Sequence, residues 1–171
     1  MADLPVHATS PIGRCGLASA MALSLLVTLT AACSNESEEA DASRIQPMLA
    51  AVMHSRTNEV RRLAEAGIGL NERYYTNNTT PMIFAAGSDQ WPVVEILLDH
   101  RADIWAHDEF GITAAQFATT SRILPGSPED AARLRVIEKL KARGYQFPPP
   151  ESDMVLAMVE NGKWPPPASG Q

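Results

Sequence analysis

The chain has 171 residues and a formal net charge of −6 at pH 7, which suits one domain with appendages. The acidic balance argues against a protein that binds the phosphate backbone of nucleic acids. Both cysteines, Cys15 and Cys33, lie in the first fifth of the chain, and no Cys or His grouping has the spacing of a zinc site. We therefore expect no metal and no cofactor.

Residues 1–32 have the layout of a secretory signal peptide. Arg14 is the only positive side chain before an uncharged run from residue 15 to residue 35, whose apolar centre is at residues 21–29. A Thr-Ala-Ala-Cys sequence then ends at Cys33 and resembles a bacterial lipobox. The resemblance implies that Cys33 is lipidated and becomes the first mature residue, and that Ser34 after it favours sorting to the outer membrane.

Two alternatives stay open for this segment: an ordinary cleaved signal, and an uncleaved anchor, because about 20 uncharged residues can span a bilayer. Its content of Ala, Ser and Thr argues against the anchor. We expect a protein of the bacterial periplasm, lipid-anchored to the outer membrane. Residues 33–43 are small, polar and acidic, and we expect a flexible tether there between the lipid and the folded domain.

The segment 80–106 (TPMIFAAGSDQWPVVEILLDHRADIWA) predicts two consecutive helices. Thr80 is a good N-cap, and Pro81 suits the first helical position, where its missing N–H is not needed. Trp91 is expected to pack at the start of the second helix, whose apolar residues have helical spacing. The order T-P-x-x-x-A-A, V-V-x-x-L-L and A-D-x-x-A resembles one ankyrin repeat almost from end to end.

The same pattern recurs on both sides of this segment. A shift of 33 residues from Thr80 reaches Thr113, in a D-x-x-G-x-T motif whose Gly111 supplies the positive φ of a turn. A shift of 34 residues the other way reaches Gln46. Repeats are therefore predicted at 44–76, 77–109 and 110–147. A loop at 121–127 interrupts the third, and a longer helix follows it, with a basic face that we interpret as solvated; a binding role is the alternative.

The last segment, 148–171, is rich in proline and contains a predicted short helix at 153–160. We interpret it as a cap over the open end of the stack, because terminal repeats need a partner for their apolar face. The alternative is a docking peptide for proline-binding receptors.

The resemblance implies an all-α fold: an ankyrin-repeat solenoid of stacked helix-turn-helix units with short hairpin-like loops and a C-terminal capping helix. The physics agrees, because one helix pair cannot bury its own apolar face and neighbouring pairs must stack into a continuous core. Ser55, Asp89 and Arg101 stand where the family usually has glycine. These changes predict a less regular and less stable array.

The sequence offers no constellation for catalysis. It has no nucleophile elbow, no Ser-His pairing and no glycine-rich phosphate loop. His100 and His107 flank a turn, and we interpret them as surface polar residues rather than metal ligands. We expect a protein that is not an enzyme.

Binding residues follow from the resemblance, because ankyrin partners usually contact the loop tips and the inner face of the first helices. Aromatic residues at such tips make binding hot spots when exposed; the alternative is that they fold back against a neighbouring repeat. The predicted tips are Arg73, Tyr74, Tyr75, Asn77 and Asn78, then Trp105, His107, Glu109, Phe110 and Ile112, with inner-face positions Met53, His54, Gly87, Ser88, Thr120 and Ser121.

The sequence is compatible with three functions. The first is a non-catalytic protein-binding module tethered to the bacterial envelope, an immunity or inhibitor protein that neutralises a periplasm-acting toxin or lipase effector. The second is a scaffold or chaperone-like helper for an envelope or stress-defence enzyme, and the third, least favoured, is a cryptic hydrolase. The expected partner is another protein, with no nucleic acid and no membrane contact except through the lipid on Cys33.

Overall fold

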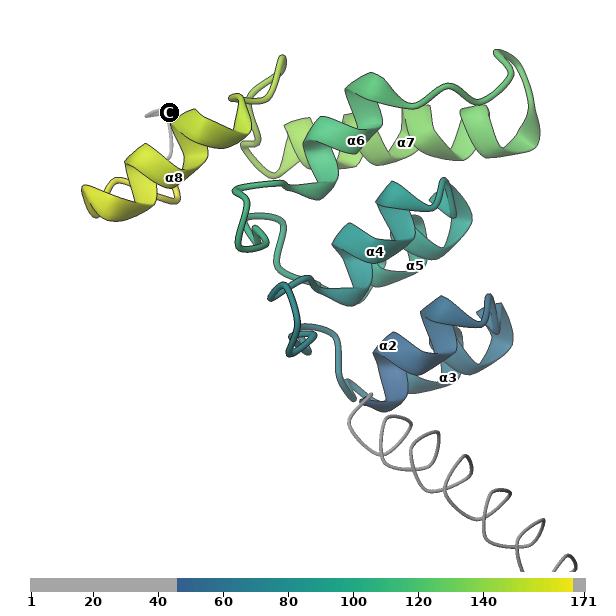
Figure 1. Ribbon diagram of the computed structural model, residues 1–171. Helices are drawn as coiled ribbons and strands as arrows, with labels where there is room; N and C mark the ends of the chain where they lie inside the picture. Colours follow the sequence, from purple (N-terminus) through teal and green to yellow (C-terminus); the bar gives the residue numbers. More distant parts are fainter. Residues whose placement is uncertain (1–45, 168–171) are drawn as a thin grey trace, which may run out of the picture. The chain divides into compact units, whose positions relative to one another are not determined.

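The computed structural model describes residues 46–167, where all regular secondary structure is helical. Three helix pairs are stacked side by side, and one further helix follows them (Figure 1). This confirms the predicted all-α repeat stack. The pairs are α2 (Pro47–Met53) with α3 (Thr57–Glu65), α4 (Pro81–Gly87) with α5 (Trp91–Asp99), and α6 (Ala114–Thr120) with α7 (Pro128–Ala142); the last helix is α8 (Ser152–Glu160).

The first 45 residues lie outside the described part of the chain, and with them the predicted signal peptide, the tether and Cys33. None of the described helices has the length and apolar character that a membrane span requires.

The three inner helices α2, α4 and α6 begin in three different ways. Thr80 caps α4 by accepting a hydrogen bond from the Ile83 N–H at 3.3 Å, as its sequence predicts. At α6 the Gln116 side chain reaches back and accepts from the Thr113 N–H at 3.0 Å. Gln46 gives α2 no side-chain cap; instead the Glu72 carboxylate accepts from the Leu49 N–H at 3.1 Å. Glu72, in the loop after α3, thus satisfies a backbone donor that α2 leaves unpaired.

Three non-glycine residues have left-handed backbone where the ankyrin pattern usually has glycine: Ser55 at φ 54°, Asp89 at φ 54° and Arg101 at φ 68°. Side chains other than Gly, Asn and Asp adopt this conformation at a cost. Asp89 has a compensating role, because its carboxylate accepts hydrogen bonds from Trp91 Nε1 at 3.0 Å and from the Ser121 hydroxyl at 2.6 Å. It joins the α4–α5 turn to the end of α6.

The core runs continuously through the three pairs. Alanines of the inner helices are buried and allow close approach, among them Ala51, Ala85 and Ala118. Larger side chains of the outer helices α3, α5 and α7 fill the second layer, and α5 contributes most of them because it packs between α3 and α7. Its buried residues are Trp91, Val93, Val94, Ile96, Leu97 and Leu98.

The basic face of α7 is not simply solvated. The Arg135 guanidinium forms an ion pair with Glu95 on α5 at 2.8 Å. Lys139 bridges Glu95 at 3.0 Å and Asp99 at 2.6 Å. The hydrogen bond from Arg135 is the main reason that the pKa of Glu95 is lowered to about 2. These charges therefore hold the second and third pairs together.

This network predicts a pH dependence of stability. The pKa of Glu95 is depressed in the folded state, so its contribution is complete above the unfolded pKa of about 4.3 and is lost as the pH falls toward 2. We expect Glu95→Gln to lower the free energy of unfolding at pH 7 by about 1 kcal/mol, as for a networked surface pair. The difference from the unmodified chain should shrink steadily below pH 4. Urea titrations across this pH range measure it.

Glu138→Gln is the matched control, because Glu138 forms only an exposed pair with Lys141 on its own helix. Such pairs contribute little, so this variant should follow the unmodified chain at every pH. Equal pH profiles for Glu95→Gln and the unmodified chain would show that the network does not stabilise the stack.

Candidate functional site

The two predicted loop tips lie against each other. The Arg73 guanidinium donates to the carbonyl oxygens of Asn78, at 3.0 Å, and of His107, at 2.6 Å. The Glu109 N–H donates to the Asn77 carbonyl oxygen at 3.0 Å. Residues from two repeats are thus tied into one continuous edge, and Arg73 itself is used to join the tips.

Each tip is also fixed from within. In the first, the Tyr74 N–H donates to the Thr79 carbonyl oxygen at 2.8 Å, and Asn78 has the left-handed backbone expected of Asn, with φ 58°. In the second, the buried Asp108 carboxylate accepts from the N–H groups of Phe110, at 2.9 Å, and Ile112, at 2.8 Å. Gly111 has the predicted positive φ, 79°.

Two aromatic rings are exposed along this edge. Tyr75 is 56 % exposed and Phe110 is 57 % exposed. The half-buried ring of Tyr74 contacts that of Tyr75 edge-on, with centroids 4.9 Å apart. Of the other predicted tip residues, Glu109 is exposed and Ile112 half-buried.

Trp105 adopts the alternative conformation, folded back against its neighbours. Its ring stacks on Tyr145, with centroids 4.5 Å apart, and contacts Trp164 edge-on at 5.5 Å. Its carbonyl oxygen accepts a hydrogen bond from Trp164 Nε1 at 2.8 Å. Phe147 completes the group beside Tyr145. We refer to Trp105, Tyr145, Phe147 and Trp164 as the aromatic cluster; the sequence identified Trp105 but not its three partners.

The segment after α7 returns to the loop edge. α8 lies beside the turn before α6 (Figure 1): a Cβ on Gly111 would stand 2.2 Å from the Ser152 carbonyl oxygen and 2.9 Å from Leu156 Cγ. Gln116 Nε2 donates to the Pro150 carbonyl oxygen at 2.7 Å. The predicted helix therefore exists and packs against the turn of the last repeat, and this segment extends the candidate surface.

The inner-face positions are more weakly defined. His54, Gly87, Ser88 and Thr120 are exposed at the ends of α2, α4 and α6, whereas Met53 is half-buried. Ser121 is occupied by its hydrogen bond to Asp89. Among residues 46–167 no three His, Cys, Asp or Glu side chains gather in a group that could hold a metal ion.

A family model described as ankyrin repeats, in three copies, matches residues 18–108, which is more than half of the chain. The match includes both helix pairs from α2 to α5 and the first loop tip, and it ends at Asp108 in the second. No curated protein is similar enough to this chain to count as a match. The third pair lies beyond the matched range, yet it continues the same stack. The chain therefore belongs to the ankyrin repeat family, whose repeats form protein-binding modules.

Proposed function

We propose that this chain is a non-catalytic binding protein held in the bacterial envelope by a lipid on Cys33, and that it acts as an immunity protein for a periplasm-acting toxin or lipase effector. The binding surface is the edge formed by the two loop tips. The membership of the chain in the ankyrin repeat family supports the proposal that its partner is a protein. The predicted lipid anchor supports the immunity role by analogy with lipoprotein immunity factors, because a tethered binder would meet an effector that reaches the periplasm.

The observation that carries the proposed surface is the pair of exposed rings, Tyr75 and Phe110, on a fixed edge. Exposed apolar patches mark sites of protein–protein interaction, and aromatic side chains are enriched among the residues that contribute most to binding. The hydrogen bonds from Arg73 and Glu109 hold the tips together before any partner arrives. A surface fixed in this way loses little conformational entropy on binding.

Capture from a bacterial envelope extract tests this surface. The double variant Tyr75→Ala with Phe110→Ala is expected to weaken capture of the partner by about 1,000-fold, because aromatic hot spots contribute about 2 kcal/mol each and every 1.4 kcal/mol is a factor of about ten in affinity. The readout is the amount of the captured protein across a concentration series of bait. The control is Leu124→Ala with Leu134→Ala, which removes two exposed apolar side chains elsewhere in the third repeat.

Capture by the control should equal that of the unmodified chain. Unchanged capture by the tip variant would contradict the proposed surface. The captured protein also separates the functions: a toxin or lipase that the chain inhibits supports immunity, whereas an envelope enzyme that it leaves active supports the helper function.

The anchor has its own test. Cells that express the full-length chain should incorporate radioactive fatty acid into it, and Cys33→Ser should abolish the label. Persistent label in Cys33→Ser, or none in the unmodified chain, would contradict lipidation at Cys33.

A further inference from the structure

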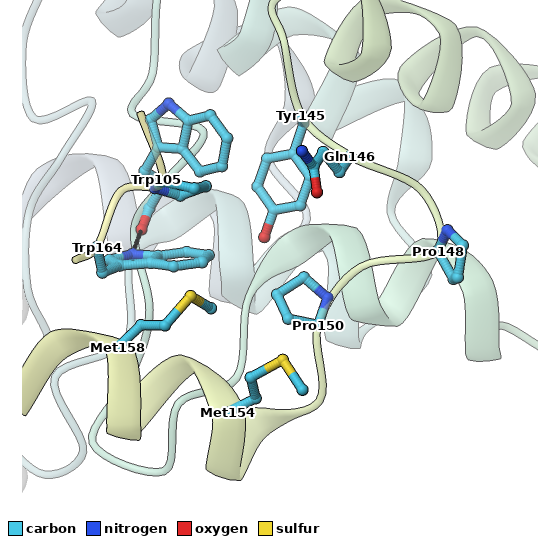
Figure 2. Close-up of a pocket in the computed structure, with 9 residues that line it drawn as sticks. Trp105, Tyr145, Gln146, Pro148, Pro150, Met154, Met158 and Trp164 are labelled. Carbon is cyan, nitrogen blue, oxygen red and sulfur yellow. Dashed lines mark hydrogen bonds between the residues drawn. The ribbon is translucent and has the colours of Figure 1, made fainter. Parts of the chain in front are cut away.

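A cavity of about 240 Å³ opens between the aromatic cluster and α8. Figure 2 shows Met154 and Met158 of α8 facing Trp164 and Pro150 across it. Trp105, Tyr145 and Gln146 form the opposite wall. Two further prolines, Pro148 and Pro166, line its rim. Cavities of this size suit one ring-sized group rather than a whole ligand of drug size.

The side chains of the wall leave few hydrogen-bond donors for an occupant. Trp164 Nε1 is used by the Trp105 carbonyl oxygen at 2.8 Å, and the Tyr145 hydroxyl donates to Thr113 Oγ1 at 3.1 Å. The indole nitrogen of Trp105 points away from the methionines in Figure 2. Of the described residues that line the cavity, none is charged and only Gln146 carries an amide. An occupant with several polar groups would leave them unpaired.

The methionines favour an aromatic occupant. Thioethers make favourable contacts with aromatic rings, and their unbranched side chains adapt to the shape of what they meet. One face of Trp105 is already covered by Tyr145, which stacks on it with an interplanar angle of 16°. A cation therefore cannot bind through that face of Trp105. Proline-rich peptides are disfavoured too, because their backbone carbonyls need the donors that Trp164 and Tyr145 have already used.

We propose that this cavity receives one aromatic side chain of the partner protein. The inference rests on the proposed function for the partner. Ser152 and Leu156 of α8 contact Gly111, the residue next to the exposed Phe110. A partner protein bound to the two loop tips would therefore place a residue close to the cavity, next to its residues that contact the tips. The tips and the cavity form one extended surface, in which the tips insert rings into the partner and the cavity accepts one from it.

Binding of N-acetyl-tryptophanamide to the full-length chain in detergent tests the cavity without any knowledge of the partner. The methyl resonances of Met154 and Met158, followed by NMR on methyl-labelled methionine, should shift saturably at millimolar probe. Met154→Glu should weaken binding at least 10-fold, read from the Met158 methyl, because it places a carboxylate at the cavity. Met154 is 55 % exposed, so the change should leave the fold intact; Met154→Ala, with a smaller effect, is the uncharged second variant.

Val159→Glu is the matched control, because Val159 is an exposed residue of the same helix and does not line the cavity. It should bind the probe like the unmodified chain. Absence of saturable shifts, equal binding by Met154→Glu, or stronger binding of an acetylated triproline amide or of N-acetyl-lysinamide would each overturn the proposal.

Two further arms separate this inference from the proposed function. The tip variant, Tyr75→Ala with Phe110→Ala, should lose the partner but keep probe binding, because neither residue lines the cavity. Met154→Glu should weaken capture of the partner as well as of the probe. If it lost the probe and captured the partner normally, the cavity would not be part of the interface, and the tip surface would stand alone.

Discussion

Replacing Trp91 by alanine is expected to lower the free energy of unfolding by about 4 kcal/mol, as is usual for a fully buried tryptophan. Trp91 is the largest side chain in the core that has no solvent exposure. Its indole N–H also donates to Asp89 at 3.0 Å. The substitution opens a cavity in the α4–α5 pair. It also removes one of the hydrogen bonds to the Asp89 carboxylate, which links this pair to the end of α6. Urea denaturation followed by far-UV circular dichroism measures the loss.

The position of Trp91 makes the effect spread beyond its own repeat. In a repeat array each pair is stabilised mainly by its neighbours, and α5 packs against both α3 and α7. A destabilised middle pair therefore weakens both ends, and we expect one cooperative transition at lower urea.

Trp91→Phe is the control, because it keeps a ring in the core and removes the indole N–H. It should cost about 1–2 kcal/mol, since it combines a smaller cavity with one lost hydrogen bond. If Trp91→Ala stayed within 1 kcal/mol of the unmodified chain, the middle pair would not be the centre of stability that its burial indicates.

Much of this fold could be predicted from the sequence because its determinants are local. Thr80 and Pro81 start a helix through their own backbone preferences. Gly111 and Asn78 mark left-handed turns for the same reason. Its place in the apolar pattern predicts that Trp91 packs at the start of its helix, and it is buried there. The stack itself follows from helix pairs too small to bury their own apolar faces.

Other features could not be predicted, because they join residues that are distant along the chain. Glu72 caps a helix that begins 25 residues earlier, at Pro47. The bond between Trp164 and Trp105 spans 59 residues, and no spacing rule connects two tryptophans so far apart. The sequence therefore left open whether Trp105 is exposed. The sequence predicts a helix that covers the last repeat, and α8 packs against Gly111 in the turn of that repeat, but the repeat pattern does not specify this point of contact.

Gly111→Ala is the second large expected effect, because Gly111 combines a left-handed backbone with a close contact. Its φ is 79°, and the added Cβ would stand 2.2 Å from the Ser152 carbonyl oxygen, which belongs to the backbone and cannot rotate away. Backbone strain should cost about 1 kcal/mol, because a Cβ crowds the following carbonyl oxygen in left-handed backbone, and forcing the contact apart should cost about 2 kcal/mol more. We expect α8 to detach from the loop tip, so that its amides lose protection in hydrogen exchange while those of α4 and α5 keep it.

Gly126→Ala separates the two causes. Gly126 has nearly the same backbone, with φ 81°, but nothing lies within 4 Å of its added Cβ. This control should therefore show the backbone cost alone, with α8 protected as in the unmodified chain. Because Met154 and Met158 of α8 form one wall of the cavity, Gly111→Ala should also abolish binding of N-acetyl-tryptophanamide, and Gly126→Ala should not. Equal behaviour of the two variants would mean that the packing of α8 on Gly111 contributes nothing to the surface proposed to bind the partner.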